Sequence, residues 1–143
     1  ESRGEVSWAL ARVAKLHRQR ADELLSKLGL HVGQEMLLNV LWTQGEMSQT
    51  ELADRLDIQP ATLTVALKRL EKSGLIVRAR DPEDKRVSKV QPSYKSGELR
   101  NGVMLAWSRL EHDSVAGLTD AEQGMLKILL NKVAASLSED QIE

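Results

Sequence analysis

The sequence contains no cysteine and no phenylalanine, and only one tyrosine and three prolines among its 143 residues. Without cysteine there can be no disulfide, no thiolate metal ligand, no cysteine nucleophile and no cysteine-based peroxide sensing. No apolar run approaches ~18 residues, and no charged-then-apolar leader is present. We therefore expect a soluble, cytoplasmic protein that does not contact membranes.

Motifs for catalysis and metal binding are also missing. The chain has no phosphate loop, no GxGxxG and no GxSxG, which argues against an enzyme. Its three histidines, His17, His31 and His112, are far apart in the sequence and lack zinc-site spacing. We expect no metal and no cofactor. The scarcity of aromatic residues also disfavours single-stranded RNA binding, which uses aromatic stacking platforms.

Charge is distributed unevenly along the chain, although the formal net charge is only -1. Residues 60–90 hold eight Lys or Arg against four Asp or Glu, a local balance of +4, whereas residues 1–59 sum to -2 and residues 91–143 to -3. A solvated surface explains most such clusters. A basic segment that coincides with a nucleic-acid-binding motif is instead typical of a DNA-binding region.

Residues 48–72 predict two short helices. Ser48 lies three residues before Glu51, the spacing of a capping box at a helix start. Pro60 suits the first turn of a second helix, because its missing N–H costs nothing there. In that helix Leu63, Ala66, Leu67 and Leu70 follow a helical period and are expected to face a core. The exposed side then carries Ala61, Thr62, Thr64, Val65, Lys68, Arg69 and Lys72.

A charged hairpin is predicted after Gly74, which suits a left-handed helix end. Residues 75–80 alternate with period two, as a strand does. The segment 81–86 supplies turn-forming and charged residues, and residues 87–91 can return as the partner strand. Met47 is a candidate for a short third strand. The pattern of two helices followed by such a hairpin indicates a winged helix-turn-helix.

The stretches SQTELADRL and PATLTVALKRLEKSGLIVRARDPEDKR, together with LTDAE before the last helix, resemble the MarR family of transcriptional regulators. The most specific part is Asp84 followed two residues later by Arg86. One departure concerns the end of the wing, where Pro92 and Ser93 replace the Leu-Thr that is usual in the family and Gly97 stands one residue late. We expect the junction between wing and next helix to be reshaped.

The resemblance implies a homodimer that reads double-stranded DNA. The second helix would enter the major groove and contact bases and phosphates. The residues concerned are Gln59, Ala61, Thr62, Thr64, Val65, Lys68, Arg69 and Lys72. The start of the first helix, at Ser48 and Gln49, would contact phosphates. Wing contacts would come from Arg80, Asp84, Lys85 and Arg86, with Arg86 entering a narrow minor groove. The plain alternative is that Asp84 and Arg86 merely pair within an exposed turn.

Apolar stripes are also predicted on flanking helices near residues 5–28, 34–43, 96–116 and from Thr119 to Leu137. The fold class is therefore mainly α with a small β-wing. We assign residues 34–92 to the winged helix-turn-helix region, and residues 5–31 and 93–140 to dimerisation helices of a single MarR-like chain. The alternative is that the flanking helices fold back into one monomeric core.

In MarR-like proteins a small aromatic or anionic effector commonly binds between the dimer helices and the winged domain. His17, Arg18, Trp42 and Trp107 lie on helices that could border such a pocket, although core or interface packing explains them equally well. We expect a repressor that is released by its ligand. The alternative is a winged-helix module that binds protein, which the basic residues Lys68, Arg69 and Lys72 oppose.

Overall fold

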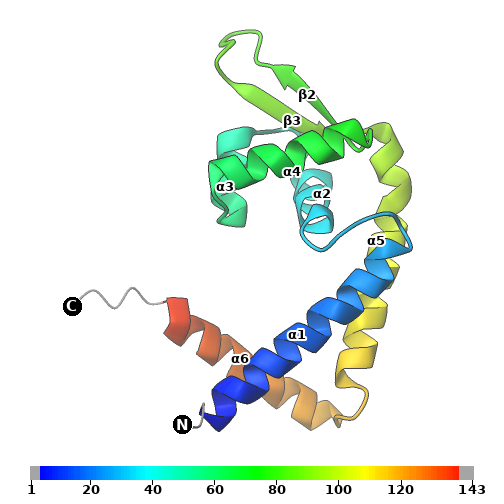
Figure 1. The fold of residues 1–143 in the computed structure, drawn as a ribbon, viewed down its shortest axis with the longest axis vertical. Helices are drawn as coiled ribbons and strands as arrows, with labels where there is room; N and C mark the ends of the chain where they lie inside the picture. The colour runs from blue at the N-terminus through cyan, green and yellow to red at the C-terminus, as the bar shows by residue number, and fades with distance from the viewer. Residues whose placement is uncertain (1–3, 139–143) are drawn as a thin grey trace, which may run out of the picture. The chain divides into compact units, whose positions relative to one another are not determined.

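The computed structural model describes residues 4–138 and is mainly helical, with one small antiparallel sheet (Figure 1). The elements are α1 (Glu5–Ser26), α2 (Gln34–Gln44), β1 (Met47–Ser48), α3 (Gln49–Leu56), α4 (Pro60–Lys72), β2 (Ile76–Arg80), β3 (Ser88–Pro92), α5 (Tyr94–Val115) and α6 (Asp120–Ser138). The chain divides into two compact units, one ending at Leu110 and the other beginning at Glu111. The predicted fold class, a winged helix-turn-helix with flanking helices, is confirmed.

The core of the first unit lies between α2, α3, α4 and the sheet. Most of its members are leucines. Three of these on α4 that the helical period had placed inward, Leu63, Leu67 and Leu70, are 0% exposed. The end of α1 and the first part of α5 also contribute. The buried cluster comprises Leu25, Leu30, Leu37, Leu38, Leu41, Met47, Leu52, Ala53, Leu63, Leu67, Leu70, Leu75, Ile76, Val90 and Val103.

The helix-turn-helix begins and ends where the local chemistry predicts. Ser48 caps α3, because its Oγ accepts a hydrogen bond of 3.1 Å from the backbone N–H of Glu51. Pro60 is the first residue of α4. Gly74 follows the end of α4 with φ 76°, a left-handed conformation that glycine adopts without strain. The backbone N–H of Leu75 then bonds back to the carbonyl of Leu70 and closes the helix end.

The wing is a three-stranded antiparallel sheet in the order β1-β3-β2. Ile76 pairs with Pro92 and Arg80 with Ser88, so the hairpin closes around residues 81–87 and projects beyond the helices (Figure 1). Met47 pairs with Val90, which confirms the short third strand. β3 runs from Ser88 to Pro92, one residue later than the predicted 87–91.

Two serines organise the junction between the wing and α5. Ser93 Oγ donates a 2.6 Å hydrogen bond to the carbonyl of Gly74 and accepts one of 3.1 Å from the backbone N–H of Ser96. The buried Ser96 hydroxyl donates to the carbonyl of Ser93 and accepts from the indole Nε1 of Trp42 at 3.1 Å. The helix therefore begins at Tyr94, two residues before the predicted start.

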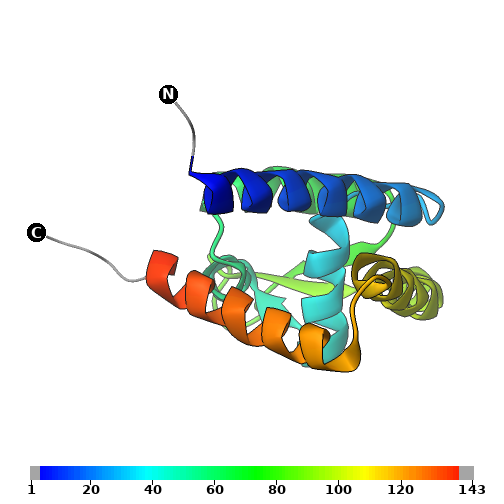
Figure 2. The ribbon, with the colours of Figure 1, turned by 90° about the horizontal axis from the view of Figure 1, so that it is seen from below.

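The outer helices are regular. α1 runs as one unbroken helix, and so does α6 in the second unit (Figure 2). The predicted capping box before α6 is confirmed in both directions: Thr119 N–H donates to Glu122 Oε1 at 3.0 Å, and Glu122 N–H to Thr119 Oγ1 at 3.2 Å. Among residues 4–138, no helix is long and apolar enough to span a bilayer.

Candidate nucleic-acid interface

One face of α4 is turned to solvent along the whole helix. Val65 is 53% exposed although it is apolar, which sets it apart from the fully buried leucines on the opposite side. The turn before α4 adds Gln59 to this surface. The exposed residues on this side are Gln59, Ala61, Thr62, Val65, Lys68, Arg69 and Lys72. The side chains carry two lysines, one arginine and no carboxylate, so the surface is cationic.

Thr64 differs from the other residues predicted for this face. It is half-buried, and its Oγ1 donates to the carbonyl of Pro60 at 2.9 Å while accepting a 2.8 Å hydrogen bond from Gln49 Nε2. Because a hydroxyl has one proton, its donor is already used within α4. Thr62 has no such partner among the described residues and keeps its hydroxyl free. Thr64 therefore differs from Thr62 both by a local bond within α4 and by a tertiary contact with α3.

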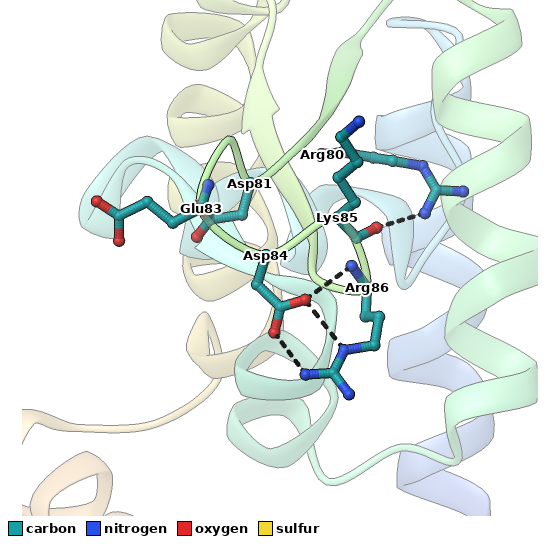
Figure 3. A network of polar contacts seen from close by, with 6 residues as sticks. All are labelled: Arg80, Asp81, Glu83, Asp84, Lys85 and Arg86. Carbon is teal, nitrogen blue, oxygen red and sulfur yellow. Dashed lines mark hydrogen bonds and ion pairs between the residues drawn. The ribbon is translucent and has the colours of Figure 1, made fainter.

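Asp84 and Arg86 form a tight pair at the end of the wing (Figure 3). Asp84 Oδ1 accepts from Arg86 Nε at 3.1 Å and from the Arg86 backbone N–H at 3.0 Å. These hydrogen bonds from the Arg86 side chain and backbone lower the pKa of Asp84. The Arg86 side chain remains 91% exposed. The pair is therefore both the exposed turn contact of the plain alternative and a carboxylate that orients a projecting arginine.

The other wing residues differ in how they are held. Arg80 donates from Nη1 to the carbonyl of Lys85, which closes the hairpin loop (Figure 3). The side chain of Glu83 points away from this network (Figure 3). Asp81 accepts from the backbone N–H of Glu83 at 2.8 Å and lies 3.6 Å from Lys89 Nζ, and its pKa is lowered chiefly by the first of these contacts. The hairpin loop is thus held by contacts among residues of the wing itself.

An open groove of about 770 Å³ brings the start of α3 together with the wing. Ser48, Gln49 and Arg86 all line it, so residues predicted separately as phosphate and wing contacts border one surface. Thr50, Ser88 and Lys89 also border the groove and were not predicted. Alternation along residues 87–91 could not have indicated both wing residues, because it places Ser88 and Lys89 on opposite faces of the strand.

Arg78 is a further residue that the sequence did not single out. Its side chain is only 22% exposed, and its Nε lies 3.6 Å from Glu71 Oε2 near the end of α4. Nε and Nη2 are buried without a hydrogen-bond acceptor among the described residues. Since Arg78 belongs to β2, this ion pair connects the wing to the last turn of α4. Strand alternation showed which face Arg78 occupies but not that α4 covers that face.

The four candidate effector residues do not converge. His17 and Trp107 do meet, with ring centroids 6.5 Å apart, while Arg18 is exposed. Trp42 instead bonds to Ser96, which lies eleven residues before Trp107 on α5, about 16 Å along the helix. A small molecule between His17 and Trp107 would therefore not reach the indole nitrogen of Trp42.

Glu35 on α2 is a buried carboxyl, 1% exposed, that sequence reasoning missed. Its Oε1 accepts from the backbone N–H of Gly33 at 3.3 Å, and its side chain also accepts a hydrogen bond from Trp107 on α5. Burial raises its pKa above the ordinary 4.5, and the two hydrogen bonds offset part of that rise. The helical period of α2 places position 35 beside inward-facing residues. This pattern was the sequence feature that could have predicted the burial of Glu35. Within residues 4–138 no group of three or more potential ligands could hold a metal ion.

The arrangement of α3, α4 and the hairpin β2–β3 defines a winged helix-turn-helix protein. The MarR family model matches residues 30–88. The HTH-type transcriptional repressor IacR of Pseudomonas putida is 30% identical over 128 residues, covering 90% of this chain and 77% of IacR. A mutant MarR from E. coli complexed with operator DNA superposes with a TM-score of 0.81 at 25% identity, covering 90% of this chain and 92% of that one.

A third similar protein is Bordetella bronchiseptica BpsR, in a structure that addresses regulation of DNA binding by 6-hydroxynicotinic acid. It superposes with a TM-score of 0.81 at 23% identity over 92% of this chain and 94% of BpsR, a likeness that concerns the fold. The family model and the similar proteins point to the same family. The chain belongs to the MarR family and is a transcriptional regulator rather than an enzyme.

Proposed function

We propose that this protein is a homodimeric, sequence-specific binder of double-stranded DNA that represses transcription from a pseudo-palindromic operator in the cytoplasm and is released by a small molecule. The observation that carries the proposal is the exposed cationic face of α4 beside an exposed wing arginine. In this assignment residues 34–92 are the DNA-binding region, and residues 5–31 and 93–140 hold the dimer together.

The α4 face has the composition that reading a major groove requires. Thr62 and Val65 present methyl groups to thymine methyls, and the free Thr62 hydroxyl can bond to a base edge. Lys68, Arg69 and Lys72 supply cations for phosphates, a contact that positions the protein without reading sequence. Because Thr64 is committed to Gln49, we assign it the orientation of α4 rather than a base contact.

The wing and the start of α3 complete the interface. Gln49 and Ser48 border the same groove as Arg86, so a DNA backbone there would meet the start of α3 and a guanidinium, although the carboxylates of Glu51, Asp54 and Asp81 also line it. Asp84 holds Arg86 in a projecting position. An arginine presented in this way suits the enhanced negative potential of a narrow minor groove.

Self-association is supported by apolar side chains left exposed on the outer helices. On α1 these include Val6 at 71%, Trp8 at 57% and Val13 at 63% exposure. On α6, a helix without a buried residue, they include Ile128 at 53% and Leu129 at 49%. Apolar surface of this kind typically marks an interface, and a two-fold dimer is its commonest form. Two copies of α4 would then read half-sites about 34 Å apart.

The proposal is tested by selecting duplexes from a random DNA pool at about 0.15 M salt, where non-specific phosphate contacts weaken. We expect a pseudo-palindrome whose half-sites repeat after one turn of duplex. Sedimentation of the protein should give twice the 15.9 kDa chain mass, and Leu129→Glu should shift it towards one chain. Absence of any enriched sequence would overturn the proposal and favour a module that binds protein. A single unrepeated half-site would overturn the dimer.

A further inference from the structure

Two hydrogen bonds join α2 to α5, and in both of them the donor is an indole N–H. Trp42 on α2 donates from Nε1 to Ser96 Oγ on α5 at 3.1 Å. In the opposite direction, Trp107 on α5 donates to the carboxyl of Glu35 on α2. Both acceptors are deeply buried, Ser96 at 0% exposure and Glu35 at 1%. We call these two bonds the indole clamps. All four residues belong to the first unit.

The two clamps are far enough apart to fix an angle between the helices. Glu35 and Trp42 are seven residues apart on α2, about 10 Å, and Ser96 and Trp107 are eleven residues apart on α5, about 16 Å. The earlier residue of α2 meets the later residue of α5, so the two helices run in opposite directions. One attachment point would leave α5 free to tilt over α2, whereas two points separated by this distance oppose the tilt.

The clamp at Ser96 is also connected to the end of α4. The Ser96 hydroxyl donates to the carbonyl of Ser93 at 2.8 Å, and Ser93 Oγ donates to the carbonyl of Gly74 at 2.6 Å. Lys95 adds a further contact, because its Nζ donates to the carbonyl of Ser73 at 3.2 Å. The first turn of α5 is therefore bound both to α2 and to the end of the helix that carries the proposed DNA-reading face.

Position 96 lies where this chain departs from the usual MarR pattern. The family usually has a glycine three residues after the threonine that Ser93 replaces, and in this chain the glycine stands at position 97 instead. A glycine at position 96 would have no side chain and could not accept the hydrogen bond from Trp42. The clamp at Ser96 is therefore a feature of this chain that membership of the family does not supply.

A small tilt of α5 would change the distance between two DNA-reading helices. Within the first unit, α5 extends about 21 Å from Ser96 to Leu110, at roughly 1.5 Å per residue. A tilt of about 10° at Ser96 would displace Leu110 by about 4 Å, which is close to the rise of one base pair, roughly 3.4 Å. In a dimer held together through α5, both copies would contribute such a displacement. The angle between α2 and α5 therefore sets operator spacing to within about one base pair.

We propose that the four residues of the indole clamps are positioning residues for DNA recognition, because they fix the angle between α2 and α5 and thereby the spacing of half-sites that the dimer accepts. This inference rests on the proposed function, since it needs a dimer that reads two half-sites. None of the four side chains contacts DNA in this assignment. They act through α4, whose end and whose neighbouring helix α2 they hold against α5.

The first test asks whether the clamps form in solution, and it needs no DNA. The chain has three tryptophans, so labelled indole N–H groups give three resonances. Ser96→Ala should speed hydrogen exchange at the Trp42 indole about tenfold, because it removes one buried hydrogen bond, and should leave the rate at Trp8 unchanged. Ser108→Ala is the matched control, because Ser108 is exposed on the same helix. An unchanged Trp42 rate in Ser96→Ala would contradict the clamp.

The second test measures discrimination between operator spacings. A duplex recovered from the pool is compared with versions that carry one extra or one missing base pair between the half-sites. The ratio of the dissociation constants is the readout, because partial unfolding would lower the affinity for every duplex by the same factor and leave the ratio unchanged.

Wild type and Ser108→Ala should discriminate by about 100-fold or more, because one base pair moves a half-site by roughly 3.4 Å and turns it by about 34°, which prevents simultaneous contact with both half-sites. In Ser96→Ala and in Trp42→Phe the ratio should fall at least about fivefold, since each removes one partner of the clamp. Equal ratios in wild type and Ser96→Ala would overturn the inference.

The two clamps are separated by conservative variants. Ser96→Ala and Trp42→Phe remove the two partners of one bond, so the double variant should show the same ratio as either single variant. Additive effects would contradict a shared bond. Glu35→Gln keeps an acceptor for Trp107 and should keep the wild-type ratio, whereas Glu35→Met, which has no such acceptor, should lower it. Equal ratios in these two Glu35 variants would overturn the role of the second clamp.

The outcomes distinguish this inference from the proposed function. A selected pseudo-palindrome whose spacing is discriminated equally well by wild type and Ser96→Ala would support the proposed function and overturn the inference. Selection of no paired half-sites would overturn both. In that case the indole exchange rates still decide whether α2 and α5 are clamped together.

Discussion

Gln49 Nε2 on α3 donates a 2.8 Å hydrogen bond to Thr64 Oγ1 on α4. The two residues are fifteen positions apart, and this contact joins the two helices of the helix-turn-helix at their exposed edge. The Thr64 hydroxyl in turn donates to the carbonyl of Pro60. One side-chain amide and one hydroxyl therefore join α3 to α4, in addition to the buried core between them.

Thr64→Val should lower the free energy of unfolding by about 1 kcal/mol, because it leaves the Gln49 amide without its acceptor. Thr62→Val, two residues earlier and with a free hydroxyl, should leave stability within about 0.5 kcal/mol. Urea denaturation of both variants measures the difference. In a double-mutant cycle with Gln49→Ala, the Thr64 effect should largely disappear. Equal stability of the two valine variants would show that the bond contributes nothing.

Arg86→Ala should weaken binding to the selected duplex about tenfold or more while leaving stability unchanged, since water screens an exposed ion pair. Asp84→Ala should weaken it less, because the arginine loses its orientation and keeps its charge. Fluorescence anisotropy with labelled duplex measures both. Glu83→Ala is the control, because its side chain points away from the network (Figure 3). Wild-type affinity in Arg86→Ala would mean that the wing pair is only a turn contact.

Glu35 should make the fold less stable as the solution becomes less acidic. Its pKa is raised in the folded chain, so the folded state holds the proton more tightly than the unfolded one. That stabilisation is complete below the ordinary pKa and is lost as the pH rises through the raised pKa. Glu35→Gln keeps an acceptor for Gly33 and Trp107 but does not titrate. We expect the variant to gain stability relative to wild type between pH 4 and pH 7, measured by urea denaturation at each pH.

The matched control for this pH series is Glu98→Gln, at an exposed position of α5. Its stability relative to wild type should vary less with pH than that of Glu35→Gln. A pH-independent difference between wild type and Glu35→Gln would contradict the assigned burial of this carboxyl.

Leu67→Ala should lower the free energy of unfolding by about 2 to 5 kcal/mol, because it empties a fully buried position between α4 and its neighbours. Val65→Ala, two residues earlier on the exposed face, should cost less than about 0.5 kcal/mol and change duplex binding instead. Thermal denaturation and anisotropy separate the two effects. Comparable destabilisation by both substitutions would contradict the assignment of the two faces of α4.

Much of the fold followed from the sequence because its signals are local. A capping hydroxyl reaches an amide three residues on, so Ser48 and Thr119 marked helix starts without knowledge of their surroundings. The leucines of α4 repeat with the helix period, so their buried side could be predicted. Period-two alternation and the turn-forming residues 81–86 likewise predicted the two wing strands, because these signals are also local. The junction after Pro92 was harder, because Ser93 closes it through Gly74, nineteen residues away.

The sequence by itself determined the order of helices and strands and the two faces of α4, because each depends on neighbours within a few residues. The tertiary structure alone decided which side chains from distant segments meet. It brought Thr64 to Gln49, Trp42 to Ser96 and Glu35 to Trp107, and it opened a pocket that residues 31–34, Met36 and Leu37 line together with Arg69. Contacts between distant segments depend on how the helices pack against one another. The periodicity of the sequence indicates which face of a helix is buried but not which element covers that face.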